Sequence, residues 1–289
     1  MYPARSLIAF STLSGLGFGL LVWLGIDPAP PTGWVALVFF ALAHGLCLAG
    51  LAASALHLRR RDRALKAFSQ WRSSWLSREA WAAVAALLAG GGQGLALMLD
   101  QPLLPLGWLS AALALAAVTC TAMIYAQLKA VPRWHHWSTP ALFLLTALAG
   151  GALLSGHVTA ALILLPALGA LQIWTWHDGD TRFARSGSTP ATATGLAGRG
   201  SVRPLFPAQT GSTYVLDEMV FVVARRHLKK LRVLGLAFMV VLPVPLLLLP
   251  MPHLFGAVAL VSHVAGVVLS RWVFFAEAEH VVGLYHGRG

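Results

Sequence analysis

Residues 54–81 of this chain read SALHLRRRDRALKAFSQWRSSWLSREAW, a basic segment between two long apolar runs. Each flanking run is about 20 residues long, which is the length of an α-helix that crosses the hydrocarbon core of a bilayer. The seven Lys/Arg residues of the segment make it too polar to lie inside the membrane. The pattern therefore predicts two membrane helices that are joined at one bilayer surface by residues 58–78, which we call the basic arch.

The composition of the whole chain is typical of an integral membrane protein. Apolar residues make up 57% of the sequence, charged residues make up 11%, and the mean hydropathy is +0.72. Eight runs are long enough to span a bilayer as helices. We place these predicted helices near 6–26, 34–57, 79–99, 106–128, 140–157, 159–176, 233–250 and 254–275. The sequence thus predicts an all-α membrane protein with one domain over residues 1–289 and one long loop, 177–232, whose Gly-, Ser- and Thr-rich first part predicts an extended strap.

The basic residues predict how the chain crosses the membrane. With eight spans, both termini and the even-numbered loops share one face, and all 21 Lys/Arg residues fall on it. The opposite face carries only Asp27 and Asp100, so the charge is 21 − 8 = +13 on one face and −2 on the other. Because Lys and Arg concentrate in cytoplasmic loops, we expect both termini, the arch and the strap in the cytoplasm. Basic residues this close to a membrane favour lipid or a docked protein over nucleic acid.

The arch itself has a helical pattern. Its apolar residues Leu65, Phe68 and Trp71 are followed by Trp75 at the same spacing of three and four, with basic residues between them. This pattern predicts a short amphipathic helix that lies in the membrane interface. Glu79 follows at the predicted start of the third helix, where the helix dipole favours a negative charge.

A histidine and a glutamate flank the arch. His57 ends the second predicted helix, and Glu79 begins the third helix 22 residues later at the same membrane face. An imidazole can exchange a proton with a quinone oxygen near neutral pH, and a carboxylate can pass that proton to water. We therefore interpret His57 and Glu79 as a candidate catalytic pair for quinone chemistry, with Ser54, Arg78 and Arg61 as candidate contacts to the quinone. Alternatively, His57 is an ordinary interfacial residue and Glu79 a favourable helix-start charge.

Metal chemistry on this chain has weaker support. His44 and His263 lie at similar predicted depths and could flank a haem, but two matching depths arise easily among 11 histidines. The chain has two cysteines, Cys47 and Cys120, whereas a four-cysteine iron–sulfur cluster needs four thiolates. We therefore expect no haem, no iron–sulfur cluster and no metal ligands here, and keep a haem-b electron carrier as an alternative.

Several long segments resemble the membrane-anchor subunit of dimethyl sulfoxide reductase. They are SALHL and KAFSQWRSSWLSRE at the arch, IYAQLKAVPRWHHWSTP after the fourth predicted helix, VRPLFPAQTGSTYVLDEM in the strap and RWVFFAEAEHVVGLY near the C-terminus. The resemblance implies an eight-helix anchor in a bacterial inner membrane that exchanges electrons with ubiquinone or menaquinone and lacks haem. It also implies two partners, a ferredoxin-type iron–sulfur subunit and a catalytic subunit with a molybdenum bis-pterin cofactor. The family's quinol-site histidine and glutamate correspond to His57 and Glu79.

Two features depart from this family's pattern. The family commonly continues the histidine as His-Leu-Gly-x-Pro, whereas three arginines follow His57 and Leu58 here. Dimethyl sulfoxide reductase also places its catalytic subunits outside the cytoplasmic membrane, whereas the charges predict a cytoplasmic partner face here. This orientation resembles the cytoplasm-facing relatives, of which quinone-dependent sulfite dehydrogenase is the best known. We therefore predict an anchor of that type; a dimethyl sulfoxide reductase anchor that oxidises menaquinol, and a purely structural anchor or transporter, are the alternatives.

Overall fold

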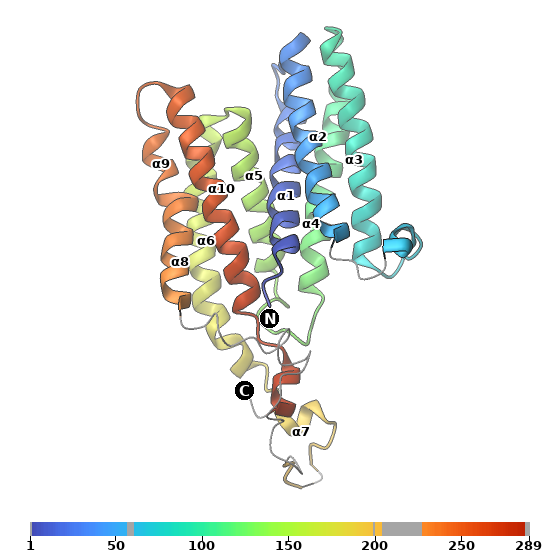
Figure 1. The fold of residues 1–289 in the computed structure, drawn as a ribbon, viewed down its shortest axis with the longest axis vertical. Coiled ribbons are helices and arrows are strands. Elements are labelled where there is room, and N and C mark those ends of the chain that lie inside the picture. The colour runs from blue at the N-terminus through green and yellow to red at the C-terminus, as the bar shows by residue number, and fades with distance from the viewer. Residues whose placement is uncertain (1, 57–60, 199, 204–226, 287–289) are drawn as a thin grey trace.

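The computed structural model describes residues 2–56, 61–198, 200–203 and 227–286, and the long helices of this part stand side by side (Figure 1). Seven of them are long and apolar enough to cross a membrane. They are α1 (Arg5–Ile26), α2 (Gly33–Leu56), α3 (Trp75–Met98), α4 (Leu104–Ala126), α5 (Ser138–Ser155), α6 (Val158–Arg185) and α10 (Pro252–Ala276). The described part is helical, as predicted.

The predicted spans correspond closely to these seven helices, with two differences at their ends. α3 begins at Trp75, four residues before the predicted start, so Glu79 lies one turn inside the helix and not in its first turn. α6 continues to Arg185 through residues 177–185, which the sequence analysis assigned to an extended strap. At 1.5 Å per residue its 28 residues extend about 42 Å, longer than the hydrocarbon core of about 30 Å. The end of α6 therefore stands outside the hydrocarbon.

The predicted span 233–250 is an interrupted helix. It consists of α8 (Leu228–Leu236), a π-helical segment (Ala237–Val241) and α9 (Pro243–Leu246), which follow one another along α10. Pro243 explains the interruption, because proline has no N–H to donate and its ring crowds the carbonyl of the residue four positions earlier. The helix widens before this proline, and the Leu242 N–H donates to Ala237 O, five residues back, at 2.8 Å.

Side chains of α10 use the carbonyl groups that this interruption frees. Met239 O has no N–H partner at Pro243, and it lies 2.8 Å from Nδ1 of His263. The neighbouring Phe238 O accepts a hydrogen bond of 2.8 Å from the Ser262 hydroxyl. Buried backbone groups need such partners in a membrane. These bonds hold the interrupted helix against α10.

The helices form two packed groups, one of α1 to α4 and one of α5, α6, α8, α9 and α10 (Figure 1). The groups meet mainly where α1 packs on α5, and Phe143 and Ala147 of α5 belong to the same core as α1 to α4. A Cβ atom built on Gly151 of α5 would lie 2.2 Å from the backbone carbon of Gly19 on α1, so the two backbones touch. Only glycine permits this approach, which is the small-residue packing common in membrane helices. The face of α1 that carries Gly19 thereby joins the two halves.

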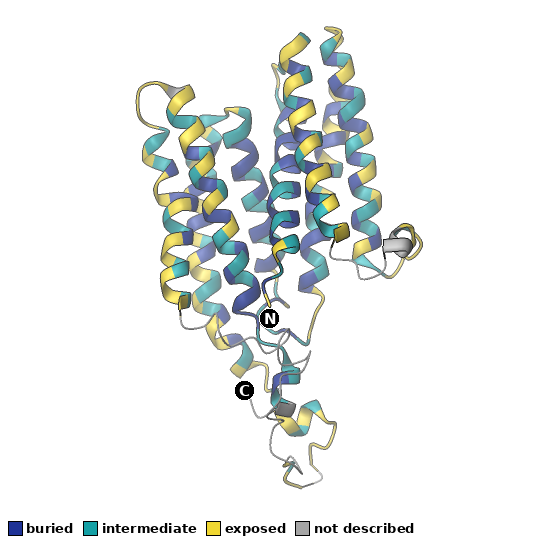
Figure 2. Cartoon of the chain, viewed as in Figure 1, coloured by how far each residue is buried: buried dark blue, intermediate teal, exposed yellow. Residues whose placement is uncertain are grey.

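The outward faces of the helices are apolar, as a lipid environment requires. Buried residues lie where the helices contact one another, and exposed residues face outward over much of each helix (Figure 2). Large apolar side chains on this outer surface include Leu88, Ile163 and Val261. Burial also changes one charge assignment. Arg271, counted above with the basic face, is 6% exposed and lies inside the bundle, with its guanidinium 3.5 Å from the ring centre of Phe143.

The long loop is only partly described. After α6, residues 186–198 and 200–203 form turns and the one-turn helix α7 (Pro190–Ala193), which a capping box between Thr189 and Thr192 closes. Residues 204–226 lie outside the described part, and with them most of the predicted loop 177–232 beyond residue 203.

Candidate functional site

Glu79 is a buried carboxyl group near one end of the bundle. It lies on α3, directly after the arch and one turn into the helix, and only 3% of its surface is exposed. α3 packs along α4, and this contact brings Glu79 to Thr121, which is 42 residues away in the sequence. Within the described part of the chain, no cation lies within ion-pair distance of Glu79. A carboxyl group so placed is costly to bury and is expected to have a function.

The hydrogen bonds of Thr121 connect the Glu79 carboxyl to α4. The Thr121 hydroxyl lies 2.5 Å from Glu79 Oε1 and 3.0 Å from Ala117 O. Both are acceptors when the carboxyl group is ionised, yet a hydroxyl has one hydrogen to donate. When Glu79 carries a proton, the carboxyl can donate to Thr121 and Thr121 can donate to the carbonyl. The geometry therefore accommodates a proton on Glu79.

The arch folds back onto α3. It contains a 3-10 helix, Arg61–Phe68, which is shorter than the predicted amphipathic helix, and Trp75 already belongs to α3. The indole N–H of Trp81 donates to Phe68 O at 3.0 Å, and the rings of Phe68 and Trp81 meet edge to face at 5.3 Å. These contacts fix the end of the 3-10 helix beside α3.

Arg78 closes the arch from the α3 side. Its Nε and NH2 groups donate to Trp71 O at 3.0 Å and Arg72 O at 2.7 Å. Its guanidinium also lies 4.4 Å from the ring centre of Trp75. Arg78 therefore positions the arch backbone, a role that the sequence did not indicate. Its predicted contact with a quinone stays a prediction.

The structure describes the other predicted site residues unevenly. Ser54 lies half-buried in the last turn of α2, on the helix that packs beside α3. His57 follows the end of α2 but lies outside the described residues, as does the side chain of Arg61. The end of α2 and the start of α3 lie at the same end of the bundle (Figure 1). The pairing of His57 with Glu79 therefore stays a prediction.

The two histidines of the haem alternative belong to different surroundings. His44 on α2 has Nδ1 2.7 Å from Phe40 O and Nε2 2.9 Å from Leu87 O, so both ring nitrogens face carbonyl oxygens. His263 lies in the other helix group, bound to Met239 O. His44 thus has no free nitrogen for an iron. In the part of the chain that the structure describes, no three His, Cys, Asp or Glu side chains gather as metal ligands.

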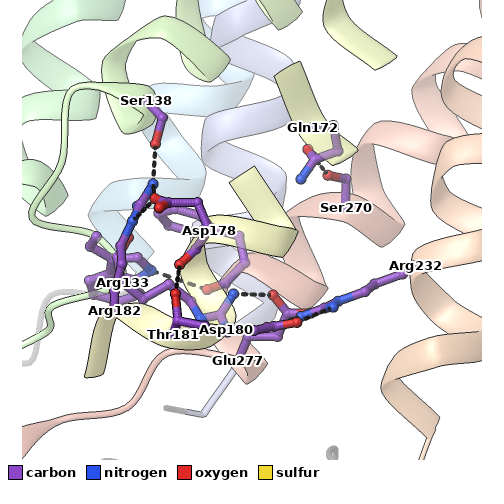
Figure 3. A network of polar contacts seen from close by, with 12 residues as sticks. Arg133, Ser138, Gln172, Asp178, Asp180, Thr181, Arg182, Arg232, Ser270 and Glu277 are labelled. Atoms are coloured by element: carbon purple, nitrogen blue, oxygen red, sulfur yellow. Dashed lines mark hydrogen bonds and ion pairs between the residues drawn. The ribbon is translucent and has the colours of Figure 1, made fainter. Parts of the chain in front are cut away.

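A network of charged side chains joins four segments (Figure 3), at the end of the bundle where α3 begins (Figure 1). Arg133 contacts Asp180 at 2.5 Å and Glu277 at 3.1 Å. Arg232 binds the same two carboxylates, with 2.6 Å and 2.8 Å to the oxygens of Asp180 and a closer contact to Glu277. We call these four residues the ion-pair cluster. It connects the loop after α4 with α6, α8 and the end of α10.

Arg182 extends these contacts toward α5. It donates to Asp178 Oδ2 at 2.5 Å, to Arg133 O at 2.9 Å and to the Ser138 hydroxyl at 3.2 Å. The sequence did not predict these contacts or the ion-pair cluster. Asp178 and Asp180 are acidic residues in an otherwise basic region, which indicates ion pairs nearby. This pattern does not indicate that Glu277 takes part.

Comparisons with known proteins agree with this architecture. The model of the family described as DMSO reductase anchor subunit (DmsC) matches residues 7–173, more than half of the chain. The chain is also 32% identical to the C subunit of sulfite dehydrogenase from Allochromatium vinosum, over an alignment of 332 positions that covers 99% of each protein. No solved structure matches. This chain is therefore a multi-pass membrane protein that belongs to the DMSO reductase anchor subunit family.

Proposed function

We propose that this chain is the quinone-reactive anchor of a molybdenum iron–sulfur oxidoreductase. It holds a ferredoxin-type iron–sulfur subunit and a molybdopterin catalytic subunit on a bacterial inner membrane. It passes electrons between the clusters of these partners and the quinone pool. His57 and Glu79 exchange the protons that accompany the electrons, beside a quinone contacted by Ser54, Arg78 and Arg61.

The burial of Glu79 carries this proposal. Its carboxyl group is 3% exposed and is bound by a neutral hydroxyl, in a helix that the chain enters from the basic arch. A carboxyl group with only a structural role is normally paired with a cation or hydrated, because burial of an unpaired charge is costly. A group that binds and releases protons suits this setting.

The chemistry follows from the balance of a quinone reaction. Reduction of a quinone to a quinol takes up two electrons and two protons, and oxidation of a quinol releases them. The partner clusters supply or accept the electrons. In the reductive direction, the imidazole of His57 donates a proton to one quinone oxygen. Glu79, which holds a proton next to Thr121, supplies the second proton. The direction depends on the redox potentials of the partners.

We also propose eight spans, with both termini in the cytoplasm. The interrupted helix of α8, the π-helical segment and α9 supplies the eighth, because it runs along α10 in the bundle. Its carbonyl groups find partners on α10, as irregular backbone inside a membrane requires. The basic residues then all belong to the cytoplasmic half of the protein. A C-terminal reporter tests this orientation: a fused phosphatase that is active only in the periplasm should be inactive, and a fused fluorescent protein bright. An active phosphatase would reverse the orientation.

Sulfite is the proposed substrate of the catalytic partner. The support is the similarity along the whole chain to a protein named as a sulfite dehydrogenase component. Oxidation of sulfite to sulfate consumes one water and releases two electrons and two protons, which balances reduction of one quinone.

The complex that co-purifies with this chain from its native membrane tests the proposed substrate. It should contain molybdenum and iron and should reduce a short-chain ubiquinone when sulfite is added. A complex that reduces dimethyl sulfoxide with menaquinol and leaves sulfite unchanged would instead establish the alternative substrate.

A further inference from the structure

A polar cavity lies inside the bundle between α1, α4, α5 and α10. Seven of the residues that line it carry polar side chains: Ser11, Thr12, Ser14, Thr121, Thr146, His263 and Arg271. The hydroxyl groups of Ser11, Ser14 and Thr146 donate to carbonyls of their own helices. Their oxygens are therefore left with lone pairs that can accept hydrogen bonds from a molecule in the cavity.

Three deeply buried polar atoms at this cavity have no partner within the described part of the chain. They are the hydroxyl oxygen of Thr12, Nε2 of His263 and Nε of Arg271, in side chains that are 5%, 1% and 6% exposed. Because Nδ1 of His263 lies 2.8 Å from a carbonyl oxygen, it is the donor, and Nε2 is then an acceptor without a donor. The guanidinium of Arg271 has no carboxylate within ion-pair distance among the described residues. Groups of this kind normally bind ordered water.

The size of the cavity fits water and excludes a quinone. About 20 Å³ is open to the centres of water molecules, and one water needs roughly 10–15 Å³ measured in this way. One or two waters could therefore bridge the unpaired atoms. The Arg271 cation gives a strong reason for water there, because an unpaired and unhydrated charge inside a membrane is costly.

This cavity and a second one lie between Glu79 and the ion-pair cluster. Thr121 lines the first cavity and binds the Glu79 carboxyl at 2.5 Å. A second cavity of about 30 Å³ shares Thr146, Val267 and Arg271 with the first, and Arg133 and Glu277 of the ion-pair cluster line it as well. The second cavity therefore lies next to the ion-pair cluster, and the first cavity lies next to Thr121 and Glu79.

We propose that both cavities hold water and that this water carries protons between the ion-pair cluster and Glu79. The route approaches Glu79 through Thr121, on the side of α4, whereas the predicted quinone site lies on the side of the arch. Glu79 can then be reprotonated without a path through the quinone site. The role of this route in turnover depends on the proposed function, but the route itself concerns residues of this chain alone.

Hydrogen–deuterium exchange of the Glu79 carboxyl group tests the route in the full chain in lipid nanodiscs. The infrared C=O band of the protonated carboxyl group, identified as the band that is lost in Glu79→Gln, shifts when deuterium replaces its proton. After transfer to D₂O at a pH at which the band is present, exchange in the parent protein should be complete within seconds. Thr121→Val removes the hydroxyl that links Glu79 to the cavity. Gly150→Ala places a methyl group in the cavity, 3.4 Å from Nε2 of His263, and its closest contact, at 2.9 Å, is with the flexible end of the Leu16 side chain. Each variant should slow the exchange at least tenfold.

Two matched variants control for general effects of these substitutions. Thr119→Val changes a threonine on the same helix that donates to Leu115 O, as Thr121 does to Ala117 O, but does not line either cavity. Gly45→Ala changes an exposed glycine on α2 that has open space around it and does not line either cavity. Both should exchange at the parent rate. Parent-like exchange in Thr121→Val and Gly150→Ala, or exchange over hours in the parent, would overturn the route. Because no quinone is present, neither result depends on the proposed function.

Discussion

Glu79→Gln is expected to lower quinone-linked turnover of the assembled complex at least about 100-fold, the usual contribution of a general acid–base group. Glutamine has nearly the same shape and can still bind the Thr121 hydroxyl, so the packing of α3 on α4 should persist. It cannot exchange a proton near neutral pH. The measurement compares substrate-dependent reduction of a quinone with reduction of a soluble dye that takes electrons directly from the partner subunits. Only the quinone reaction should fall.

Asp100→Asn provides the control for this substitution. Asp100 is exposed at the opposite end of α3 and has a positive φ of 57°, a conformation that asparagine also adopts readily. Asp100→Asn makes the same change from carboxylate to amide, and it should leave both quinone reduction and dye reduction unchanged. If Glu79→Gln assembles and retains normal quinone turnover, Glu79 has no part in the chemistry, and the chain is better described as a structural anchor.

Gly151→Val is expected to prevent stable packing of the two helix groups. The added Cβ would lie 2.2 Å from the carbon and 2.3 Å from the oxygen of Gly19, and these are backbone atoms that cannot rotate away. Overpacking in a core costs about 1–3 kcal/mol where side chains can adjust, so a clash between backbones should exceed this range. Thermal unfolding in detergent, followed by size-exclusion chromatography, should show a much lower midpoint or a loss of monodisperse protein.

Gly256→Val is the matched change at an open position. A Cβ on Gly256 of α10 meets nothing within 4 Å, so this variant should unfold near the parent temperature. Equal unfolding temperatures for the two valine variants would mean that α1 and α5 do not approach as closely as the structure has them.

Most of the fold was predictable because membrane helices leave a strong signal in sequence. A bilayer requires long apolar runs with satisfied backbone groups, and seven of the eight predicted runs are helices at nearly the predicted positions. The differences have local causes. The run at 233–250 is interrupted because Pro243 cannot donate to Met239. α6 extends into residues 177–185. These residues are mostly polar, so the apolar run that predicted the helix ends before them.

The candidate site was predictable only in part. Glu79 was evident from the sequence, because an acidic residue stands out beside an apolar run, but its partner was not. A threonine within an apolar helix usually bonds to its own backbone, so nothing distinguished Thr121 from Thr119 before α3 and α4 were packed together. Arg271 was predicted to be a surface charge, because its burial against Phe143 of α5 also follows only from the packing of the helices.

The sequence by itself determined the class of protein, the positions of seven membrane helices and the family, because each depends on local composition or on long matching segments. Only the tertiary structure decided which polar groups are buried together. The pairing of Glu79 with Thr121, the position of Arg271 between two cavities and the sharing of Asp180 and Glu277 by two arginines all join residues far apart in the chain. Such contacts follow from helix packing at positions like Gly19 and Gly151, which the order of residues does not reveal.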